Sequence, residues 1–237
     1  MLGAITLGVA TVGAATFAGI HSMVPWSQLY GANFNGLAPG SRKLALTYDD
    51  GPNDVCTEQL LEVLARHGVK ATFFMLGRFV DERPQIARKV AESGHAIGNH
   101  TWDHPNLIFA SETELRRQIE RTQKAIADAT GITPALFRPG FGGRRPGTFG
   151  VVRSYGLEPI LWRVTCFDWS AESNEAIEGH AARQIKGGDV ILLHDGGHKR
   201  LGIDRSHTVK ATDNLLKRYK DLGYEFVSVP EMMKGQA

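Results

Sequence analysis

A chain of 237 residues is long enough to bury one full α/β core. Its 27 basic and 25 acidic residues give a formal net charge of +2 without long basic runs, so there is no electrostatic case for nucleic acid as a partner. Cys56 and Cys166 lie far apart and match no CxxC spacing, which favours free buried thiols over a zinc site or a disulfide scaffold. No pattern in the sequence defines an oligomeric state.

Residues 1–26 differ from the rest because they contain no Lys, Arg, Asp or Glu and are rich in small and apolar side chains. About 20 apolar residues span a bilayer as a helix, but Gly and Thr make this run weakly hydrophobic, and it lacks the basic start of a secretory signal. Three interpretations stay open: a membrane anchor, an uncleaved signal, and a tail packed on the folded domain. The first two predict a cell-envelope location, membrane-anchored or exported.

The stretch from Pro25 to Ser41 is rich in glycine and proline and predicts a linker. We therefore divide the chain into an N-terminal apolar segment with its linker over residues 1–41 and a folded domain over residues 42–237. Residues 1 to about 30 are expected to be dispensable for folding, because they precede the linker.

From Lys43 onwards, apolar strands, loops and amphipathic helices alternate, which indicates an α/β fold with a largely parallel sheet. Strands are predicted over residues 43–47, 71–76, 95–98, 136–138, 158–163, 189–193 and 225–229. Helices are predicted over residues 57–67, 83–93, 111–130, 148–155, 176–185 and 208–222. Ser111, with Glu114 three residues later, is a capping signature for the longest of these helices.

Polar side chains of reactive types fall just after several predicted strands. The C-terminal ends of parallel strands meet at one rim of a barrel or open sheet, where α/β enzymes build their sites. We therefore expect these side chains to lie close together and to carry chemistry. They are Asp49, Asp50, His100, Arg138, Asp168 and His194.

Asp49-Asp50-Gly51-Pro52 places two carboxylates side by side at the end of an apolar strand. Adjacent residues of an extended chain point in different directions, so one carboxylate can ligate a metal while the other faces the reacting atom. Taken alone, the four residues are equally typical of an ordinary polar turn.

His100-Thr101-Trp102-Asp103-His104-Pro105 offers two imidazoles four residues apart, which converge on one metal if the segment is helical or tightly turned. Pro105 favours an extended backbone at His104. A lone HxxxH arises by chance, but an upstream carboxylate at a strand end strengthens the metal interpretation. Two histidines and one aspartate leave open positions, as expected of a hydrolytic site.

His194 follows a strongly apolar strand, where an imidazole needs a polar partner. It is either a core histidine bonded to a backbone carbonyl or a general acid oriented by Asp168. Arg138 is either a surface charge or a guanidinium beside Asp49 that keeps this carboxylate ionised as a base.

Together, the motifs resemble those of the polysaccharide deacetylase family, the NodB-homology domain of carbohydrate esterase family 4, over about residues 43–229. Gly140 and Phe141 stand where the family usually has proline and tyrosine, and Tyr48 stands where it usually has phenylalanine. Five motifs occur in the family's order: Thr47-Tyr48-Asp49-Asp50-Gly51-Pro52, His100-Thr101-Trp102-Asp103-His104-Pro105, Arg138-Pro139-Gly140-Phe141-Gly142, Asp168-Trp169 and Leu192-Leu193-His194.

This resemblance implies a distorted (β/α) barrel with fewer strands than the eight-fold form. It also implies one divalent metal ion, zinc with cobalt or nickel as alternatives, held by Asp50, His100 and His104.

The resemblance further assigns roles to the remaining motif residues. Asp49 would be the catalytic base, supported by Arg138, and His194 would be the acid, oriented by Asp168. The backbone N–H of Phe141 would bind the oxyanion. Two further residues would contact the substrate, Trp169 as a wall of the groove and Leu192 in the acetyl pocket.

The implied activity is hydrolysis of the acetamido group of N-acetylated sugars in a glycan, which yields acetate and a free amino sugar. The alternatives are a deformylase of a lipid-linked aminosugar or a related amide hydrolase, and an inactive glycan-binding module. Retained proton carriers at Asp49 and His194 argue against the binding module. Five cations near the motifs would favour anionic glycans if they line the groove rather than a solvated loop: Arg144, Arg145, Lys199, Arg200 and Arg205.

Overall fold

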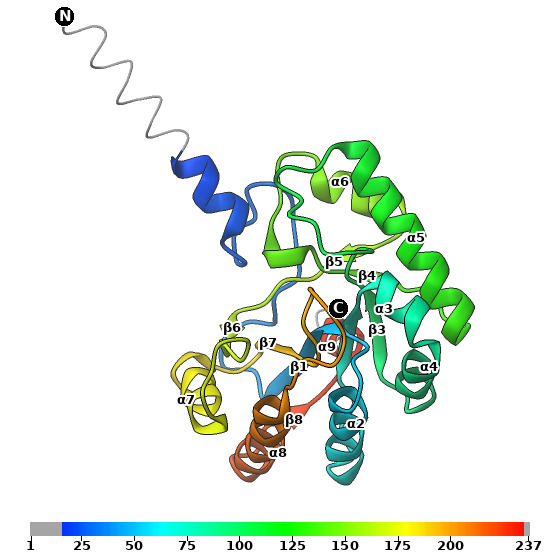
Figure 1. Cartoon of the computed structure of the whole chain (residues 1–237). Coiled ribbons are helices and arrows are strands. Elements are labelled where there is room, and N and C mark those ends of the chain that lie inside the picture. Colours follow the sequence, from blue (N-terminus) through cyan, green and yellow to red (C-terminus); the bar gives the residue numbers. More distant parts are fainter. Residues whose placement is uncertain (1–15, 235–237) are drawn as a thin grey trace, which may run out of the picture.

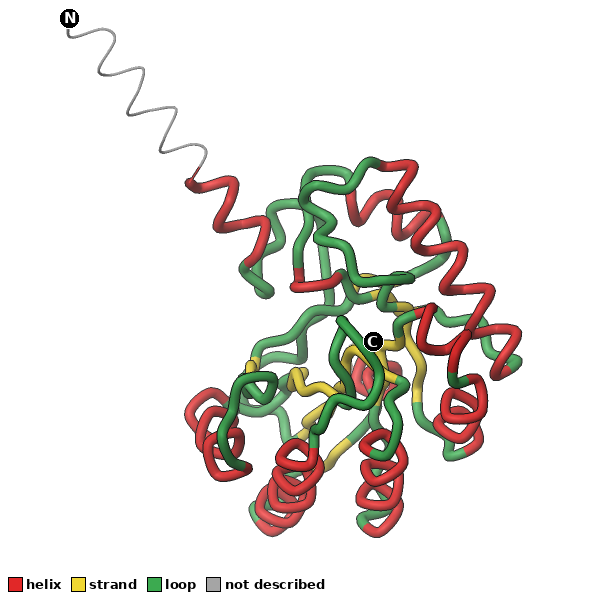
Figure 2. The backbone as a smooth tube through the Cα atoms, viewed as in Figure 1, coloured by secondary structure: helices red, strands yellow, loops and turns green. Residues whose placement is uncertain are grey.

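The computed structural model of the chain describes residues 16–234 and shows, within this range, one curled sheet of eight parallel strands. Along the curl the strand order is β5-β4-β3-β2-β1-β7-β6, and β8 pairs with β1 outside this path. Figures 1 and 2 show the helices arranged around the strands. The strands are β1 (Lys43–Gly51), β2 (Thr72–Met75), β3 (Ala96–Asn99), β4 (Leu136–Phe137), β5 (Glu158–Pro159), β6 (Val164–Thr165), β7 (Val190–His194) and β8 (Glu225–Phe226).

All six predicted helices are present, each within two residues of its predicted ends. The Ser111 hydroxyl accepts a hydrogen bond from the N–H of Glu114 at 3.1 Å, which confirms the predicted cap. Two six-residue helices, α3 and α9, escaped prediction because one turn and a half carries too little periodicity. The helices are α2 (Cys56–Arg66), α3 (Gly77–Glu82), α4 (Pro84–Glu92), α5 (Glu112–Thr130), α6 (Thr148–Ser154), α7 (Asn174–Gln184), α8 (Ser206–Asp221) and α9 (Val229–Lys234).

Successive side chains of β1 point to opposite faces of the sheet, because an extended chain repeats every two residues. Leu44, Leu46 and Tyr48 pack in the apolar cluster shared with α2, α4 and α8, whereas Ala45 belongs to a second cluster on the other face. Asp49 has the same parity as Ala45, so its side chain lies on the inner face of the curl, away from these helices. The alternation therefore explains how a strand buried on both faces delivers a carboxylate to the interior.

Strand β7 repeats the pattern beside β1. Ile191 and Leu193 pack with the outer helices, and Leu192 packs on the inner face. The parallel register pairs Asp49 with His194, so both side chains end neighbouring strands on the same face.

The parallel, curled α/β fold confirms the predicted fold class. Over the described residues the sheet has eight strands where fewer were expected, because β8 pairs with β1 in addition to the seven strands along the curl. Three predicted strands differ from the structure by more than one residue. The strand predicted over residues 225–229 ends at Phe226, and Val229 begins α9. β1 continues to Gly51, so Asp49 and Asp50 lie inside the strand rather than after it. The single strand predicted over residues 158–163 is instead β5 followed by a separate β6, because the backbone changes partners: the N–H of Ile160 donates to the carbonyl of Phe137 after β5, whereas the N–H of Arg163 donates to that of Val190 in β7. Cys56 and Cys166 are free and buried, as predicted.

The stretch expected to be a linker packs on the domain instead. Residues 16–23 form a helix, and the chain beyond it runs back to the sheet (Figure 1). Phe34 is buried and forms a bridge with Ile160, while Gly36 bridges to Asp189 at the start of β7. The prediction failed because glycine content indicates a flexible stretch but does not reveal distant backbone partners.

Within residues 16–234 we find no helix with the length and apolarity required to cross a bilayer. The predicted anchor or signal falls mainly on residues 1–15, which lie outside the described part of the chain.

Candidate active site

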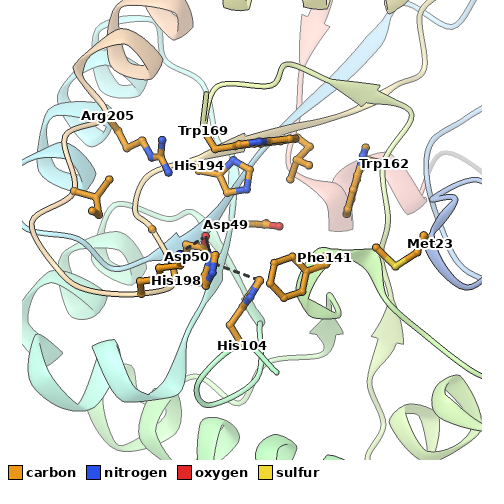
Figure 3. Close-up of a pocket in the computed structure, with 14 residues that line it drawn as sticks. Met23, Asp49, Asp50, His104, Phe141, Trp162, Trp169, His194, His198 and Arg205 are labelled. Atoms are coloured by element: carbon orange, nitrogen blue, oxygen red, sulfur yellow. Dashed lines mark hydrogen bonds and ion pairs between the residues drawn. The ribbon is translucent and has the colours of Figure 1, made fainter. Parts of the chain in front are cut away.

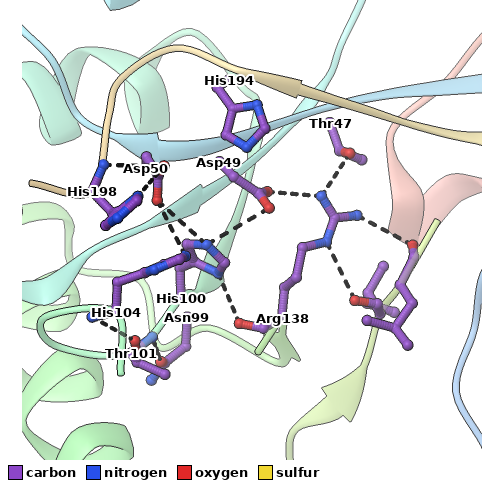
Figure 4. A network of polar contacts seen from close by, with 12 residues as sticks. Thr47, Asp49, Asp50, Asn99, His100, Thr101, His104, Arg138, His194 and His198 are labelled. Atoms are coloured by element: carbon purple, nitrogen blue, oxygen red, sulfur yellow. Dashed lines mark hydrogen bonds and ion pairs between the residues drawn. The ribbon is translucent and has the colours of Figure 1, made fainter. Parts of the chain in front are cut away.

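Asp50 reaches the inner face of the sheet through a bulge at the end of β1. Side chains two residues apart on a strand share a face, so the Asp50 side chain should face the outer helices, as that of Tyr48 does. The register with β2 shifts between Asp49 and Gly51, and Asp50 has a φ of 71°. A bulge with a left-handed residue redirects its side chain, so both adjacent carboxylates point into the same site (Figure 4).

Asp50, His100 and His104 bring three donor atoms together in a buried position. The Nε2 atoms of both histidines lie 3.6 Å from Asp50 Oδ1, which has no hydrogen-bond partner among the described residues. Ligands around a tetrahedral zinc ion are separated by about 3.4 Å, so the spacing and the partnerless oxygen fit a divalent ion.

The protonation states of this donor set also suit a metal. The carbonyl of Arg138 can only accept, so at 2.8 Å His100 Nδ1 donates to it and leaves the Nε2 lone pair free. Burial and the neighbouring His100 lower the pKa of His104 to about 3, which keeps its ring neutral. Burial raises the pKa of Asp50, but His198 and the surrounding imidazoles outweigh this effect, and the pKa lies well below its usual range. The set therefore presents the Asp50 anion and the neutral ring of His104, with His100 Nε2 beside them.

A tight turn, not a helix, brings the two histidines together. Thr101 and His104 both have left-handed backbones, with φ of 71° and 63°. The expectation of an extended backbone at His104 was therefore wrong. The hydroxyl of Thr101 accepts from the N–H of His104 at 3.2 Å, and Asn99 Oδ1 accepts from the N–H of Thr101 at 2.9 Å, so side chains hold the turn against the local preference of a residue before proline.

Arg138 orients Asp49 from a fully buried position. Its Nη1 donates to Asp49 Oδ1 at 2.7 Å and to the Thr47 hydroxyl at 2.8 Å, and the guanidinium also binds the carbonyls of Ile160 and Leu161 (Figure 4). The other Asp49 oxygen, Oδ2, lies 3.7 Å from His100 Nε2. One oxygen of Asp49 is thus fixed, and the other faces the metal donors.

His194 and Asp168 form a second buried pair. Asp168 accepts from the backbone N–H of His194 at 2.7 Å and lies 2.8 Å from Nδ1, and the Thr208 hydroxyl donates to the same carboxylate at 2.9 Å. Burial lowers the pKa of His194, but the Asp168 carboxylate outweighs this effect and the pKa is raised to about 9. The imidazole is therefore positively charged at neutral pH, with Nε2 left as a proton donor.

His198 lies at the donor set but was not predicted as a site residue. Its backbone N–H donates to Asp50 Oδ2 at 3.1 Å, and its ring stacks on that of His104 with 4.5 Å between centroids at 19°. His104 Nδ1 has no hydrogen-bond partner among the described residues, so ring contacts with His198 and Phe141 hold this imidazole. The sequence offered only one signal, a histidine four residues after His194.

A pocket of about 560 Å³ opens over these groups (Figure 3). Phe141, Trp169 and Leu192, all predicted to contact substrate, line it. Phe141 has a left-handed backbone with φ of 59°, and its side chain is 45% exposed. Gly140 leaves room for His104, because a Cβ there would lie 3.0 Å from the imidazole. Gly140, which stands where the family usually has proline, therefore lies against His104, a candidate metal ligand.

The cations expected at the groove separate into two groups. Lys199 and Arg205 line the pocket, as expected. Arg200 and Arg145 are not among the lining residues, and Arg144 is fully buried below the Phe141 loop. Of the cations expected at the groove, the two that line the pocket, Lys199 and Arg205, both lie in the loop after β7.

Comparison with known proteins places the chain in a family. Residues 37–160 match the sequence profile described as polysaccharide deacetylase. The peptidoglycan-N-acetylglucosamine deacetylase PgdA of Listeria monocytogenes is 37% identical over 82% of this chain, which spans only 40% of that relative. A chitooligosaccharide deacetylase of Rhizobium leguminosarum bv. trifolii is 32% identical over 84% of this chain and 95% of the relative.

Two solved structures extend the comparison. The Bc1960 peptidoglycan N-acetylglucosamine deacetylase, in complex with an aryl hydroxamate, is 33% identical with a TM-score of 0.80, over 88% of this chain and 95% of that chain. BA3943 of Bacillus anthracis, a CE4 family pseudoenzyme, is 27% identical with a TM-score of 0.77, over 85% of this chain and 68% of that chain. The profile match, the relatives and the shared fold agree, and the chain belongs to the polysaccharide deacetylase family.

Proposed function

We propose that the protein is a metal-dependent deacetylase that hydrolyses the acetamido group of N-acetylated sugars in a glycan. One observation carries this proposal. A candidate proton acceptor, Asp49, and a candidate proton donor, His194, lie on paired strands beside the Asp–His–His donor set. The relatives named as peptidoglycan and chitooligosaccharide deacetylases support the substrate class.

Asp50, His100 and His104 would hold the ion, with zinc first and cobalt or nickel as alternatives. Such an ion, when bound, supplies Lewis-acid polarisation of the acetyl carbonyl. Asp50 offers Oδ1 for this purpose because the His198 N–H already occupies Oδ2.

The chain's own residues perform the proton transfers. Asp49 Oδ2 accepts a proton from the attacking water while Arg138 holds Oδ1. The water oxygen bonds to the acyl carbon, and the N–H of Phe141 donates to the carbonyl oxygen as charge develops there. His194 Nε2 then protonates the nitrogen as the C–N bond breaks, which gives acetate and an amino sugar. Trp169 and Leu192 both line the pocket, where Trp169 would form a wall of the groove and Leu192 would contact the acetyl group.

Release of acetate from N-acetylglucosamine oligomers tests the proposal, with N-formylated oligomers assayed in parallel. Acetate release at a higher kcat/KM than formate release supports the deacetylase. Faster formate release would support the deformylase instead. The BA3943 neighbour shows that this family contains pseudoenzymes, so binding of the oligomer without release of either acid would identify an inactive binding module.

The pH dependence of turnover should show the raised pKa of His194. Because the acid must carry a proton, we expect activity to fall as pH rises through about 9. Asp168→Asn removes the carboxylate that raises this pKa, so the alkaline limb should move to lower pH by about 1 or more. The measurement is kcat against pH in both proteins. An unchanged alkaline limb in the variant would contradict the assignment of Asp168 as the partner of the acid.

We also expect His198 to support metal affinity through its ring. His198→Ala keeps the backbone N–H to Asp50 but removes the stack on His104, and zinc affinity should fall about tenfold. His198→Phe restores a stacked ring and should restore affinity. Competition with a chromophoric chelator measures both, with the exposed His207→Ala as control. Weak binding by the phenylalanine variant would show that a ring nitrogen matters instead.

We further propose that the chain works at the cell envelope, associated with the membrane through its N-terminal segment. Residues 1–26 carry no charged side chain, and the described part of this segment exposes large apolar groups. The exposed groups are Phe17, Ile20, Met23, Trp26 and Leu29.

The full chain is therefore expected to sediment with membranes after cell lysis and to need detergent for extraction, because its exposed apolar groups would insert between lipids. Fractionation followed by immunoblotting checks this, with a soluble cytosolic protein as control. Recovery of the full chain entirely in the soluble fraction would favour the packed-tail interpretation.

A further inference from the structure

Arg144 is a fully buried arginine that, among residues 16–234, forms no ion pair with a carboxylate. Its guanidinium donates instead to backbone carbonyls: to Gly142 at 3.0 Å, Val24 at 2.7 Å and Ser27 at 2.9 Å. Its own N–H donates to the carbonyl of Ser22 at 3.0 Å. One side chain therefore joins the N-terminal segment to the loop that carries Phe141.

The cation is well matched to this position. The helix over residues 16–23 ends here, and the last carbonyls of a helix lack partners within it and carry partial negative charge. Burial lowers the pKa of Arg144 to about 10, so the guanidinium remains charged at neutral pH. Removing the segment would take away the carbonyls of Val24 and Ser27 and leave the guanidinium with the Gly142 carbonyl alone, which is unfavourable for a charge placed here.

Arg144 also contacts the loop around Phe141, whose N–H is the proposed oxyanion donor. Phe141 and Gly142 both have left-handed backbones, with φ of 59° and 69°, and for phenylalanine this conformation is strained. Strained residues persist where their surroundings fix them. The Gly142 carbonyl that accepts from Arg144 belongs to the residue directly after Phe141.

The N-terminal segment also reaches the pocket itself. Met23, the last residue of the helix, lines the pocket, and Figure 3 shows it beside Phe141 and Trp162. Its carbonyl oxygen lies 3.7 Å from the point where a Cβ on Gly142 would stand. Met23 therefore adds an apolar side chain from the N-terminal segment to the lining of the pocket.

We infer that residues 22–27 are a structural part of the active site: Arg144 uses them to position the Phe141 loop, and Met23 forms a specificity-determining wall of the pocket. This inference rests on the proposed deacetylase function for its kinetic consequences. It reverses the expectation that the first 30 or so residues are dispensable. Arg144 acts through Phe141 and touches neither substrate nor metal, so it is a positioning residue.

The first test compares Arg144→Met, Arg144→Lys and the exposed neighbour Arg145→Ala in the full chain. Hydrogen–deuterium exchange should rise in peptides over residues 17–27 and also over residues 139–143 in Arg144→Met, with residues 43–51 still protected. kcat should fall between about tenfold and a hundredfold at unchanged metal content. Arg144→Lys should recover part of both losses, and Arg145→Ala should match the native protein.

Faster exchange confined to residues 17–27, with native kcat, would overturn the inference and make the segment an appendage. The exchange readout also separates this inference from the proposed function. If no glycan is deacetylated by any of these proteins, coupled exchange in the two segments still supports the structural link, and uncoupled exchange still refutes it.

Met23→Ala provides a second test that does not depend on a buried arginine. Removing an apolar wall should weaken binding of an aryl hydroxamate about fivefold. Acetohydroxamate, which offers far less apolar surface, should bind the native protein and the variant equally. Equal losses for both ligands would show that the substitution disturbs the metal group, and no loss for either would show that Met23 does not bound the site. Either result would refute the role of Met23.

Discussion

Asp49→Asn is expected to lower the rate of deacetylation at least about a hundredfold while the protein keeps its metal. The amide cannot accept the water proton that Oδ2 is placed to take. Its oxygen can still accept from Arg138, which now donates at 2.7 Å to Oδ1. The effect should therefore appear in kcat, because the residue contributes to proton transfer rather than to holding the sugar.

The control for this variant is Asp54→Asn, the same isosteric change at a half-exposed carboxylate paired with Arg83. Metal content and the free energy of unfolding should be measured for both variants, since Asp49→Asn also removes the counterion of a buried arginine. If Asp49→Asn keeps most of its activity in a folded, metal-loaded protein, Asp49 is not the base.

Removal of the metal should abolish activity, and added zinc or cobalt should restore it. Asp50 Oδ1 lies 3.6 Å from two imidazole nitrogens and has no other partner among the described residues, so the donor set has no evident purpose without an ion. His104→Ala should lose the ion and the activity together, because two remaining donors bind divalent ions weakly.

Elemental analysis combined with the acetate assay checks this result. The matched control is His207→Ala, which changes an exposed histidine remote from the donor set and should retain one ion per chain. An active preparation without a bound ion would contradict the metal assignment, whatever the behaviour of the proton carriers.

Much of the site could be predicted because strands can be found from the local sequence, and alternating strands and helices indicate a parallel sheet. Asp49 and His194 stand near the C-terminal ends of two apolar strands. Parallel strands of a curled sheet end at a common rim, so the two side chains are expected to lie together. Asp50 breaks the parity through its bulge, so alternation alone would have placed it among the outer helices. The motif resemblance, rather than periodicity, carried that assignment.

The parts that escaped prediction depend on contacts between distant residues. Arg144 appeared as one of several loop cations, because its acceptors lie about 120 residues earlier in the chain. His198 was grouped with loop charges, although its N–H holds Asp50. In the same way, the strand pairing of Phe34 could not be inferred from a glycine-rich stretch.

The central position of β1 has a consequence for the newly made chain. β1 lies between β2 and β7, and it also pairs with β8, so two of its three partners come from the last fifth of the sequence. Until those residues leave the ribosome, one long apolar edge of β1 stays without a partner, and such edges template aggregation. The proposed metal donors are all synthesised by residue 104, yet the sheet around them can close only after β7 and β8 have been made. We therefore expect a premature stop before residue 190 to yield insoluble protein rather than a partly active fragment.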